Sequence, residues 1–381
     1  MRVVWITHNY PRHRGDVAGA FLHPLAVAIR QRGVDLRVVA PSDAGRSGRD
    51  EMDGVPIHRV RYAAPRDERY AYRGTMADVV RSPQGWITFL RLRRALHDAA
   101  EQELGPDGVR LLHAHWWIPA GLASPTNVPL VLTSHGTDVR LLDRFSMVAP
   151  VARRVFRRAA VVTTVSRALA AIIDRRCGVM VADDAIQPMP VADLERPWSD
   201  GSGPVIVIGR LTMQKRVDLA IAGFAAARER GFGRQLRIVG DGPTRKALER
   251  QVQQLGLTGA VDFLGEVAPR AVPRLLATAS CCLMPARGEG FGLAAAEALM
   301  QGVPVIACSD GGGLTDIVAD PGAGRLVSPD VAAIAGALAA LAADPGAAAA
   351  ARRHGLHWRA QLSPDFVATR CLTWYERALH A

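Results

Sequence analysis

The strongest constraint on the fold is a regular alternation of short apolar runs with stretches of helical spacing. The runs in the first half of the chain lie at residues 3–7, 36–41, 109–115, 130–135 and 160–166. A strand that is apolar throughout must be covered on both faces, as in a parallel sheet between two helical layers. The alternation therefore predicts a doubly wound α/β fold.

The pattern breaks at the polar, Pro- and Gly-rich segment 196–204 and then starts again. The second series of apolar runs lies at residues 204–209, 236–242, 261–266, 281–285 and 303–308. A chain of 381 residues is long for one hydrophobic core and sufficient for two. We therefore expect two Rossmann-like domains, residues 1–195 and 196–365, with a last helix, 366–381, packing back on the first domain. Ligands of such sheets bind at the carboxyl ends of the strands, so a deep cleft between the domains is the expected site.

Composition narrows the class of partner. The net charge is +11, but the basic residues are almost all arginine, and Lys215 and Lys246 are the two lysines. This pattern is typical of a high-GC codon bias, so the charge does not predict nucleic-acid binding.

The five cysteines form no CxxC pair and no metal-ligand spacing, which favours reduced thiols and a cytoplasmic protein. We find neither a signal-peptide pattern nor an apolar run long enough to span a bilayer.

The glycine clusters do not match the common nucleotide-binding motifs. GDVAGAF and VGDGPTRK lack the G-x-G-x-x-G spacing, and neither lysine follows a glycine as in a P-loop. The chain also has no Asp-x-Asp pair to hold a divalent ion on a diphosphate. Positive charge for a leaving diphosphate would then come from Arg210 and Lys215, which follow an apolar run in GRLTMQKRVD. Lys246 lies beside Arg245 and Glu249 in a pattern typical of a solvated helix face.

Two glutamates, Glu289 and Glu297, are separated by seven intervening residues in PARGEGFGLAAAEAL. This segment follows HAHWWIPAG, SHGTD, GRLTMQK, VGDGP and FLGEV in the chain and precedes GVPVIACSDGGG. With this ordered set, the chain resembles the retaining glycosyltransferases of family 4, which have the GT-B fold, over nearly its whole length. Under this resemblance, the first domain takes the acceptor side and the second domain binds a nucleotide-sugar.

The resemblance implies retaining transfer of a hexosyl unit from a UDP- or GDP-sugar to an acceptor hydroxyl, by front-face displacement. It implies no metal ion and no cofactor. Glu297 would bind the ribose hydroxyls and Glu289 the hydroxyls of the transferred sugar. The implied catalytic residues are Glu289, His135, Arg210 and Lys215. The other implied donor-binding positions are Gly15, Gly19, Val267, Gly290, Phe291, Gly292 and Leu293.

Three further residues are candidates for contacts with the acceptor, which is a small molecule, a glycan or a lipid-linked group. His115 and Trp116 crowd the end of one apolar run, and Asp138 follows the next. Packing between sheet and helix explains the tryptophan equally well, and Asp138 is most simply the N-cap of the following helix.

Several alternatives stay open. Residues 90–98 and 151–160 are basic with apolar positions at helical spacing, which fits both a peripheral helix on the inner face of a membrane and an ordinary surface helix. A nucleotide-sugar epimerase or another GT-B enzyme would share this fold. A non-catalytic nucleotide-sugar-binding protein would share it too, although the full set of candidate residues argues against that reading. A nucleic-acid-binding protein is suggested by charge alone, and the sequence has neither the aromatic platforms nor a basic cluster tied to a recognised module, so we expect no nucleic-acid partner.

Overall fold

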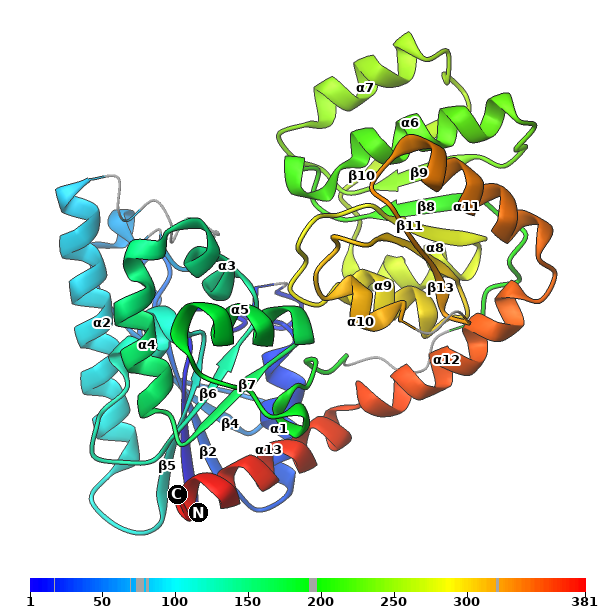
Figure 1. Cartoon of the computed structure of the whole chain (residues 1–381). Helices are drawn as coiled ribbons and strands as arrows, with labels where there is room; N and C mark the ends of the chain where they lie inside the picture. Colours follow the sequence, from blue (N-terminus) through cyan, green and yellow to red (C-terminus); the bar gives the residue numbers. More distant parts are fainter. Residues whose placement is uncertain (17, 69, 73–78, 80–81, 192–196, 320–321) are drawn as a thin grey trace. The chain divides into compact units, whose positions relative to one another are not determined.

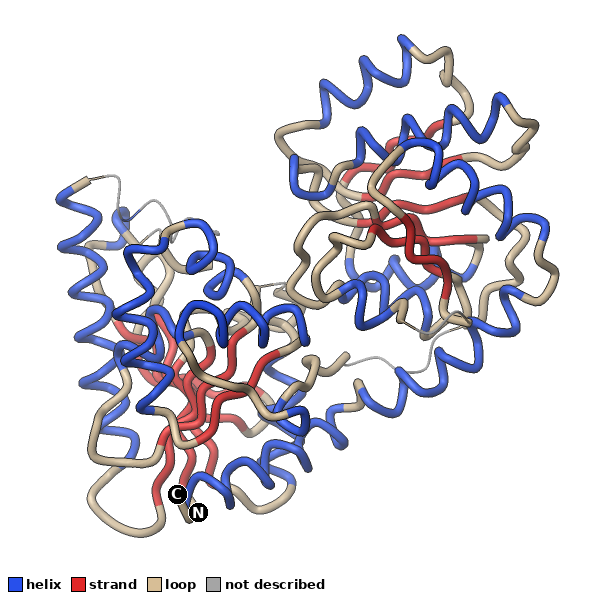
Figure 2. The backbone as a smooth tube through the Cα atoms, viewed as in Figure 1, coloured by secondary structure: helices blue, strands red, loops and turns tan. Residues whose placement is uncertain are grey.

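The chain forms two α/β units, each built on its own sheet (Figure 1). The structure is a computed structural model that describes residues 1–16, 18–68, 70–72, 79, 82–191, 197–319 and 322–381. Unit 1 comprises Met1–Ala192 and Leu362–Ala381, and unit 2 comprises Asp193–Gln361. The expected boundary at 195/196 lies close to this division. In Figure 2 the strands of each unit lie between layers of helices.

Unit 1 contains a seven-stranded sheet in the order β3-β4-β2-β1-β5-β6-β7. The strands are β1 (Arg2–Ile6), β2 (Asp35–Pro41), β3 (Gly48–Met52), β4 (Val55–Val60), β5 (Arg110–His115), β6 (Leu130–Ser134) and β7 (Val161–Thr164). The helices are α1 (Leu22–Gln31), α2 (Pro83–Leu104), α3 (Thr137–Arg144), α4 (Ala149–Arg158), α5 (Arg167–Cys177) and α13 (Pro364–Leu379). Short helical turns are η1 (Pro65–Asp67), η3 (Trp117–Gly121), η4 (Ser146–Val148) and η5 (Asp183–Ala185).

The prediction of a parallel sheet is confirmed for unit 1 except at one edge, where β3 pairs antiparallel with β4. The sequence pattern missed this hairpin because β3 is polar and almost fully exposed, with no apolar run. Its turn, Asp53-Gly54, has positive φ at both residues (49° and 77°). This is the backbone that a two-residue hairpin with the twist of its strands requires.

Unit 2 contains a six-stranded, fully parallel sheet in the order β10-β9-β8-β11-β12-β13. The strands are β8 (Val205–Ile208), β9 (Leu236–Val239), β10 (Val261–Gly265), β11 (Cys281–Met284), β12 (Val305–Cys308) and β13 (Gly324–Val327). The helices are α6 (Val217–Glu229), α7 (Arg245–Gln254), α8 (Val272–Ala277), α9 (Leu293–Leu299), α10 (Leu314–Ile317), α11 (Val331–Ala343) and α12 (Ala347–Gln361), with turns η6 (Met213–Lys215) and η7 (Pro269–Ala271). Within the described residues, no single helix is long and apolar enough to cross a membrane, and one bent pair, α11 with α12 at 99°, passes by length and composition alone.

The C-terminal helix α13 is held in unit 1 by a buried hydrogen-bond junction at Tyr375. The helix packs against α1 and against strands β5, β6 and β7. The Tyr375 hydroxyl accepts a bond from Trp5 Nε1 (2.9 Å) and lies 2.9 Å from His113 Nδ1. The indole N–H can only donate, and the direction of the bond between Tyr375 and His113 is set by the imidazole tautomer. The last helix is thereby bonded to the two central strands, β1 and β5.

Replacing Tyr375 with Phe should destabilise unit 1, because the indole and imidazole groups stay buried without their shared partner. Leaving buried polar groups unpaired costs about 1–3 kcal/mol. Urea unfolding should show this loss in the free energy of unfolding. Thr373→Ala, on the exposed side of the same helix, is the control and should stay within about 0.5 kcal/mol. An equal effect of both substitutions would contradict the role of the junction.

Candidate active site

Three loops pack directly on one another at the carboxyl edge of the unit 2 sheet, after β8, β11 and β12. The Gly288 N–H donates to Asp310 O, and the Glu289 N–H donates to Gly311 O, both at 2.9 Å. The Gly313 N–H donates back to Glu289 O at 2.9 Å. Glu289 therefore has both backbone groups bonded to the neighbouring loop, which fixes the direction of its side chain.

Glycine is required at the points where these loops touch. A Cβ on Gly312, whose φ is +65°, would lie 2.6 Å from Glu289 O. A Cβ on Gly313 would lie 2.3 Å from Gly290 O. Real Cβ atoms do not approach backbone so closely, so any side chain here would push the loops apart. The glycine run after β12 is thus explained by packing against the loop of Glu289.

The Glu289 carboxylate meets the lysine that the sequence singled out. Lys215 Nζ lies 2.9 Å from Glu289 Oε1, with the two side chains 22% and 13% exposed. Gln214 Nε2 donates to the same oxygen at 3.0 Å. The lysine stem runs over Gly209, where a Cβ would lie 3.3 Å from Lys215 Cε. Arg210, in the same loop after β8, is exposed and forms no ion pair in the described part of the chain.

The predicted donor positions beyond Glu289 form the start of α9. Gly292 is the N-cap with φ +101°, and a Cβ there would lie 2.3 Å from Leu314 Cδ2. In the first turn, the Ala295 and Ala296 N–H groups donate to Gly292 O at 2.9 and 3.2 Å, so the Leu293 and Ala294 N–H groups are the two without an acceptor within the helix. Glu297 lies one turn further on and is half-buried. Burial, with a smaller contribution from the Glu297 charge, raises the pKa of the Cys282 thiol to about 12.

Two further predicted positions flank this region. The Phe291 ring is buried, with its centroid 5.6 Å from that of Trp358 in α12. Val267 is half-buried and follows β10, whose last residue, Gly265, accepts a bond from the Gly240 N–H at 2.7 Å. The loops after β9 and β10 are therefore joined beside Val267, one of the predicted donor-binding positions.

In unit 1, the glycine loop after β1 is folded tightly on itself. Gly19 has φ +67°, and a Cβ there would lie 2.3 Å from Asn9 O. Gly15 has φ +84° with open space around it. Asp16 holds the loop by accepting bonds from Arg12 N (2.9 Å) and Arg12 Nε (2.7 Å). The need for glycine at position 19 therefore comes from the loop's own backbone.

The structure brings the predicted residues His115, Trp116 and His135 together at the carboxyl edge of the unit 1 sheet. His115 Nδ1 lies 3.1 Å from His135 Nε2. The Trp116 ring lies 4.3 Å from the His135 ring and 4.5 Å from the His8 ring, centroid to centroid. Trp116 has φ +72°, which is rare for a residue with a side chain. Phe21, which the sequence did not single out, closes the cluster 5.2 Å from the His135 ring.

Burial makes these imidazoles neutral. It lowers the pKa of His8 to about 4 and holds those of His115 and His135 well below the usual value. Among the described residues, His115 Nε2 and His135 Nδ1 are buried without a hydrogen-bond partner. A neutral imidazole carries one donor and one acceptor, so the pair has unused capacity of both kinds.

Asp138 is buried, and its carboxylate is bonded to loop backbone. It accepts bonds from Trp117 N (3.0 Å) and Gly136 N (3.1 Å), and burial raises its pKa. Gly136, not Asp138, is the N-cap of α3, so the simple capping interpretation is wrong. The aspartate instead ties the loop after β6 to the loop after β5. Trp117 is buried beside it and donates to Asp138 O at 2.8 Å, so packing explains this indole.

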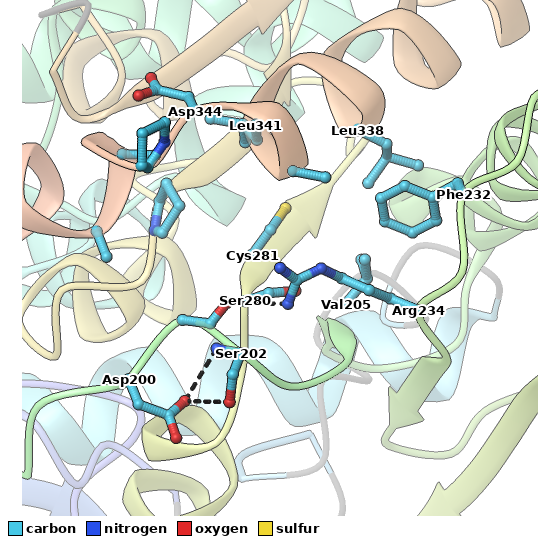
Figure 3. A pocket seen from close by; sticks show the side chains of 16 residues that line it. Asp200, Ser202, Val205, Phe232, Arg234, Ser280, Cys281, Leu338, Leu341 and Asp344 are labelled. Carbon is cyan, nitrogen blue, oxygen red and sulfur yellow. Dashed lines mark hydrogen bonds between the residues drawn. The ribbon is translucent and has the colours of Figure 1, made fainter.

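A separate cavity of about 300 Å³ lies at the opposite, amino edge of the unit 2 sheet (Figure 3). Val205 at the start of β8 and Cys281 at the start of β11 line it. Arg234 extends into it and donates to Gly201 O (2.9 Å) and Gly203 O (3.0 Å). The arginine thus braces the loop before β8, and the cavity is remote from the edge that carries Glu289.

The sequence did not single out three side chains that hold the loops around Glu289: Gln214, Arg216 and Asp310. The Arg216 guanidinium contacts both carboxylate oxygens of Asp310. Their positions in the sequence could have identified them, because Gln214 and Arg216 flank Lys215, and Asp310 directly precedes the glycine run at 311–313. Across the described ranges, no group of three or more His, Cys, Asp or Glu is placed to hold a metal ion.

Two family models match the chain and together cover most of it. The model for glycosyl transferases group 1 matches residues 195–358. The model for the glycosyl transferase 4-like domain matches residues 18–186. The first match lies on unit 2 and the second on unit 1.

Individual relatives agree with the family models. A 2-deoxystreptamine glucosyltransferase of Streptomyces kanamyceticus is 30% identical over 291 residues, covering 69% of this chain and 75% of that protein. A GDP-mannose-dependent alpha-(1-6)-phosphatidylinositol monomannoside mannosyltransferase of Mycobacterium tuberculosis is 28% identical, covering 97% and 96%. Among solved structures, sucrose-phosphate synthase from Thermosynechococcus elongatus superposes with a TM-score of 0.78 at 20% identity, covering 99% and 98%. Anabaena HepE in complex with UDP-glucose gives a TM-score of 0.67 at 18% identity, covering 98% and 99%.

Proposed function

The chain belongs to the group 1 glycosyltransferases with the GT-B fold, and from this membership we propose that it transfers a hexosyl unit from a nucleoside-diphosphate sugar to an acceptor hydroxyl with retention of configuration. The observation that carries the proposal is the contact of Lys215 with Glu289 at the carboxyl edge of unit 2. The relatives named for GDP-mannose and the neighbour solved with UDP-glucose favour a UDP- or GDP-sugar as donor.

On the donor side, each charged group has a defined partner in the reaction. Arg210 and Lys215 bind the diphosphate and oppose the negative charge that develops as it leaves. Glu289 binds sugar hydroxyls and opposes the positive charge at the anomeric carbon. Glu297 binds the ribose hydroxyls. Backbone groups complete the donor contacts of unit 2 at Val267, Gly290, Phe291, Gly292 and Leu293. Within unit 1, the proposal assigns donor contacts to the backbone at Gly15 and Gly19.

The bond changes follow front-face displacement. The anomeric carbon–phosphate oxygen bond breaks, and its electron pair stays on the phosphate oxygen. The acceptor hydroxyl oxygen bonds to the anomeric carbon on the same face and gives its proton to the departing phosphate oxygen. Two cationic side chains supply the positive charge, so we propose that the reaction needs neither a metal ion nor a cofactor.

On unit 1, the proposal assigns sugar and acceptor contacts to the histidine–tryptophan cluster. His135 has a buried nitrogen, Nδ1, with no partner among the described residues, and it suits a sugar hydroxyl. His115 and Trp116 lie beside it on the acceptor side. Asp138 acts by holding the two loops that carry them.

Lys215→Ala and Glu289→Gln should each lower turnover about a hundredfold or more, because each removes one electrostatic partner of the transition state. Initial rates of sugar transfer with purified variants measure this. Lys246→Ala is a matched control, since Lys246 is the other lysine of the chain and is exposed on α7. EDTA should leave wild-type turnover unchanged. Near-normal turnover in both site variants would refute the assignment.

A thermal-shift panel of UDP-, GDP-, ADP- and dTDP-sugars should identify the donor, because a ligand that binds only the folded state raises apparent stability. At a hundredfold excess over Kd the gain is about 2.7 kcal/mol, which is several degrees in Tm. We expect a rise with UDP- or GDP-sugars that shrinks in Lys215→Ala and persists in Lys246→Ala. Turnover of the donor without acceptor into an epimer would favour the epimerase, and binding without any turnover would favour the non-catalytic protein.

An exposed apolar and basic surface on unit 1 supports a second proposal, that the protein works in the cytoplasm against the inner face of a membrane. Trp86, Ile87 and Leu90 on α2 are 49%, 44% and 53% exposed. Arg91 and Arg93 follow them, exposed and without an ion pair among the described residues. Apolar side chains beside unpaired arginines fit an anionic lipid surface.

This surface lies at the same edge of the sheet as His135. The last residue of α2, Leu104, accepts a bond from Arg2 at the start of β1, so α2 ends at the amino edge. A helix of 22 residues is about 33 Å long, which places Trp86 and Leu90 near the carboxyl edge. A lipid-linked acceptor would then approach on the acceptor side.

Co-sedimentation with liposomes containing anionic phospholipid should show binding that is lost with added salt. Arg91→Glu/Arg93→Glu should abolish it, because the substitutions replace attraction by repulsion. Arg230→Glu/Arg250→Glu, an equal charge change on exposed residues of unit 2, should retain it. Binding that is equal in both double variants would count against this surface.

A further inference from the structure

Arg216 adopts a backbone conformation that favours glycine. Its φ and ψ are 46° and 44°, in the left-handed region. A side chain there crowds the following carbonyl, so an arginine is less stable in this conformation than a glycine would be. A disfavoured backbone beside a functional residue is a reason to ask what the side chain does.

The Arg216 side chain joins two of the three stacked loops. Its guanidinium contacts both carboxylate oxygens of Asp310, with the two side chains 19% and 38% exposed. The backbone oxygen of Asp310 accepts the Gly288 N–H at 2.9 Å. The ion pair therefore links the loop after β8, through the loop after β12, to the residue that precedes Glu289.

The other side of Lys215 is anchored as well. Gln214 O accepts the Arg287 N–H at 2.9 Å, and Gln214 Nε2 donates to Arg287 O at 3.2 Å. Lys215 thus lies between two residues that are bonded to the loops around Glu289. The Lys215 ammonium group contacts Glu289, and in the proposed function this side chain is the one that turns to the diphosphate.

We propose that Arg216 is a positioning residue whose ion pair with Asp310 keeps the Lys215 backbone in register with Glu289 while the lysine side chain changes partner. The inference rests on the proposed function, since it takes Lys215 and Glu289 as the transition-state partners. It predicts an effect on turnover more than on donor binding, because small misplacements of catalytic groups are costly.

The test compares Arg216→Gly, Arg216→Lys and Asp310→Asn. We expect Arg216→Gly and Asp310→Asn to lower kcat about tenfold, with the donor KM changed less than about threefold. Arg216→Lys keeps the charge and should recover part of the loss. Tm should stay within about 3 °C, because glycine relieves the backbone strain while an exposed ion pair contributes little stability. The double variant Arg216→Gly/Asp310→Asn should be no worse than either single variant.

Arg325→Ala is the matched control. Arg325 pairs with Asp344 at 3.6 Å, with the two side chains 39% and 40% exposed. The pair lies in unit 2 near the start of β13, at the edge away from Glu289. Its loss should leave kcat unchanged. A drop in kcat equal to that of Arg216→Gly would mean that any lost ion pair has this effect, and would overturn the proposal.

Two other outcomes decide the matter. Normal kcat in Arg216→Gly would overturn the proposal, and so would a loss in Arg216→Gly with normal kcat in Asp310→Asn, which would mean that Arg216 contacts the donor itself. Hydrogen exchange of residues 209–217 gives a readout independent of activity, and it should rise in Arg216→Gly and Asp310→Asn but not in Arg325→Ala. Failure of the proposed function would look different, since Lys215→Ala would then also keep normal turnover.

Discussion

The donor side depends on one close approach, the contact of backbone 288–290 with backbone 311–313. Glu289 uses both its N–H and its carbonyl in this contact. Two neighbouring parallel strands, β11 and β12, deliver the loops to the same edge, and glycines let them meet without an intervening side chain. The position of the carboxylate is thus a consequence of backbone geometry. The backbone packing of the two loops therefore fixes where the Glu289 carboxylate lies, and Lys215 contacts it at that position.

The Lys215–Glu289 ion pair lowers the free-energy cost of holding two charged groups in a half-buried position. A half-buried cation or carboxylate alone would be costly, and the pair compensates each charge with the other. The pair is also exchangeable, because phosphate oxygens suit the ammonium group and sugar hydroxyls suit the carboxylate. Gln214 donates to the same Glu289 oxygen, so the carboxylate keeps one partner when the lysine turns away. The two charges therefore compensate each other in the absence of a ligand, as the proposed exchange of partners requires.

Features that repeat along the chain were predictable from the sequence, and contacts between distant residues were not. The apolar runs predicted the parallel sheets because burial on both faces imposes that pattern on each strand separately. The β3–β4 hairpin escaped because its edge strand is exposed and polar. The contact of Arg216 with Asp310 spans 94 residues and that of Trp5 with Tyr375 spans 370, and no spacing rule reaches so far. The resemblance placed Glu289 and Lys215, but their direct contact needed the fold.

The histidine–tryptophan cluster of unit 1 contains buried hydrogen-bonding groups that no described residue uses. His115 and His135 share one hydrogen bond, and whichever ring donates, the pair retains one N–H and one lone pair at its two outer nitrogens. Both nitrogens are buried without a partner among the described residues, a state that costs free energy. A hydroxyl group donates and accepts, so it can satisfy either tautomer. Since burial keeps the imidazoles neutral, such a ligand meets no charge that it would have to desolvate, and the cluster suits a sugar better than an anion.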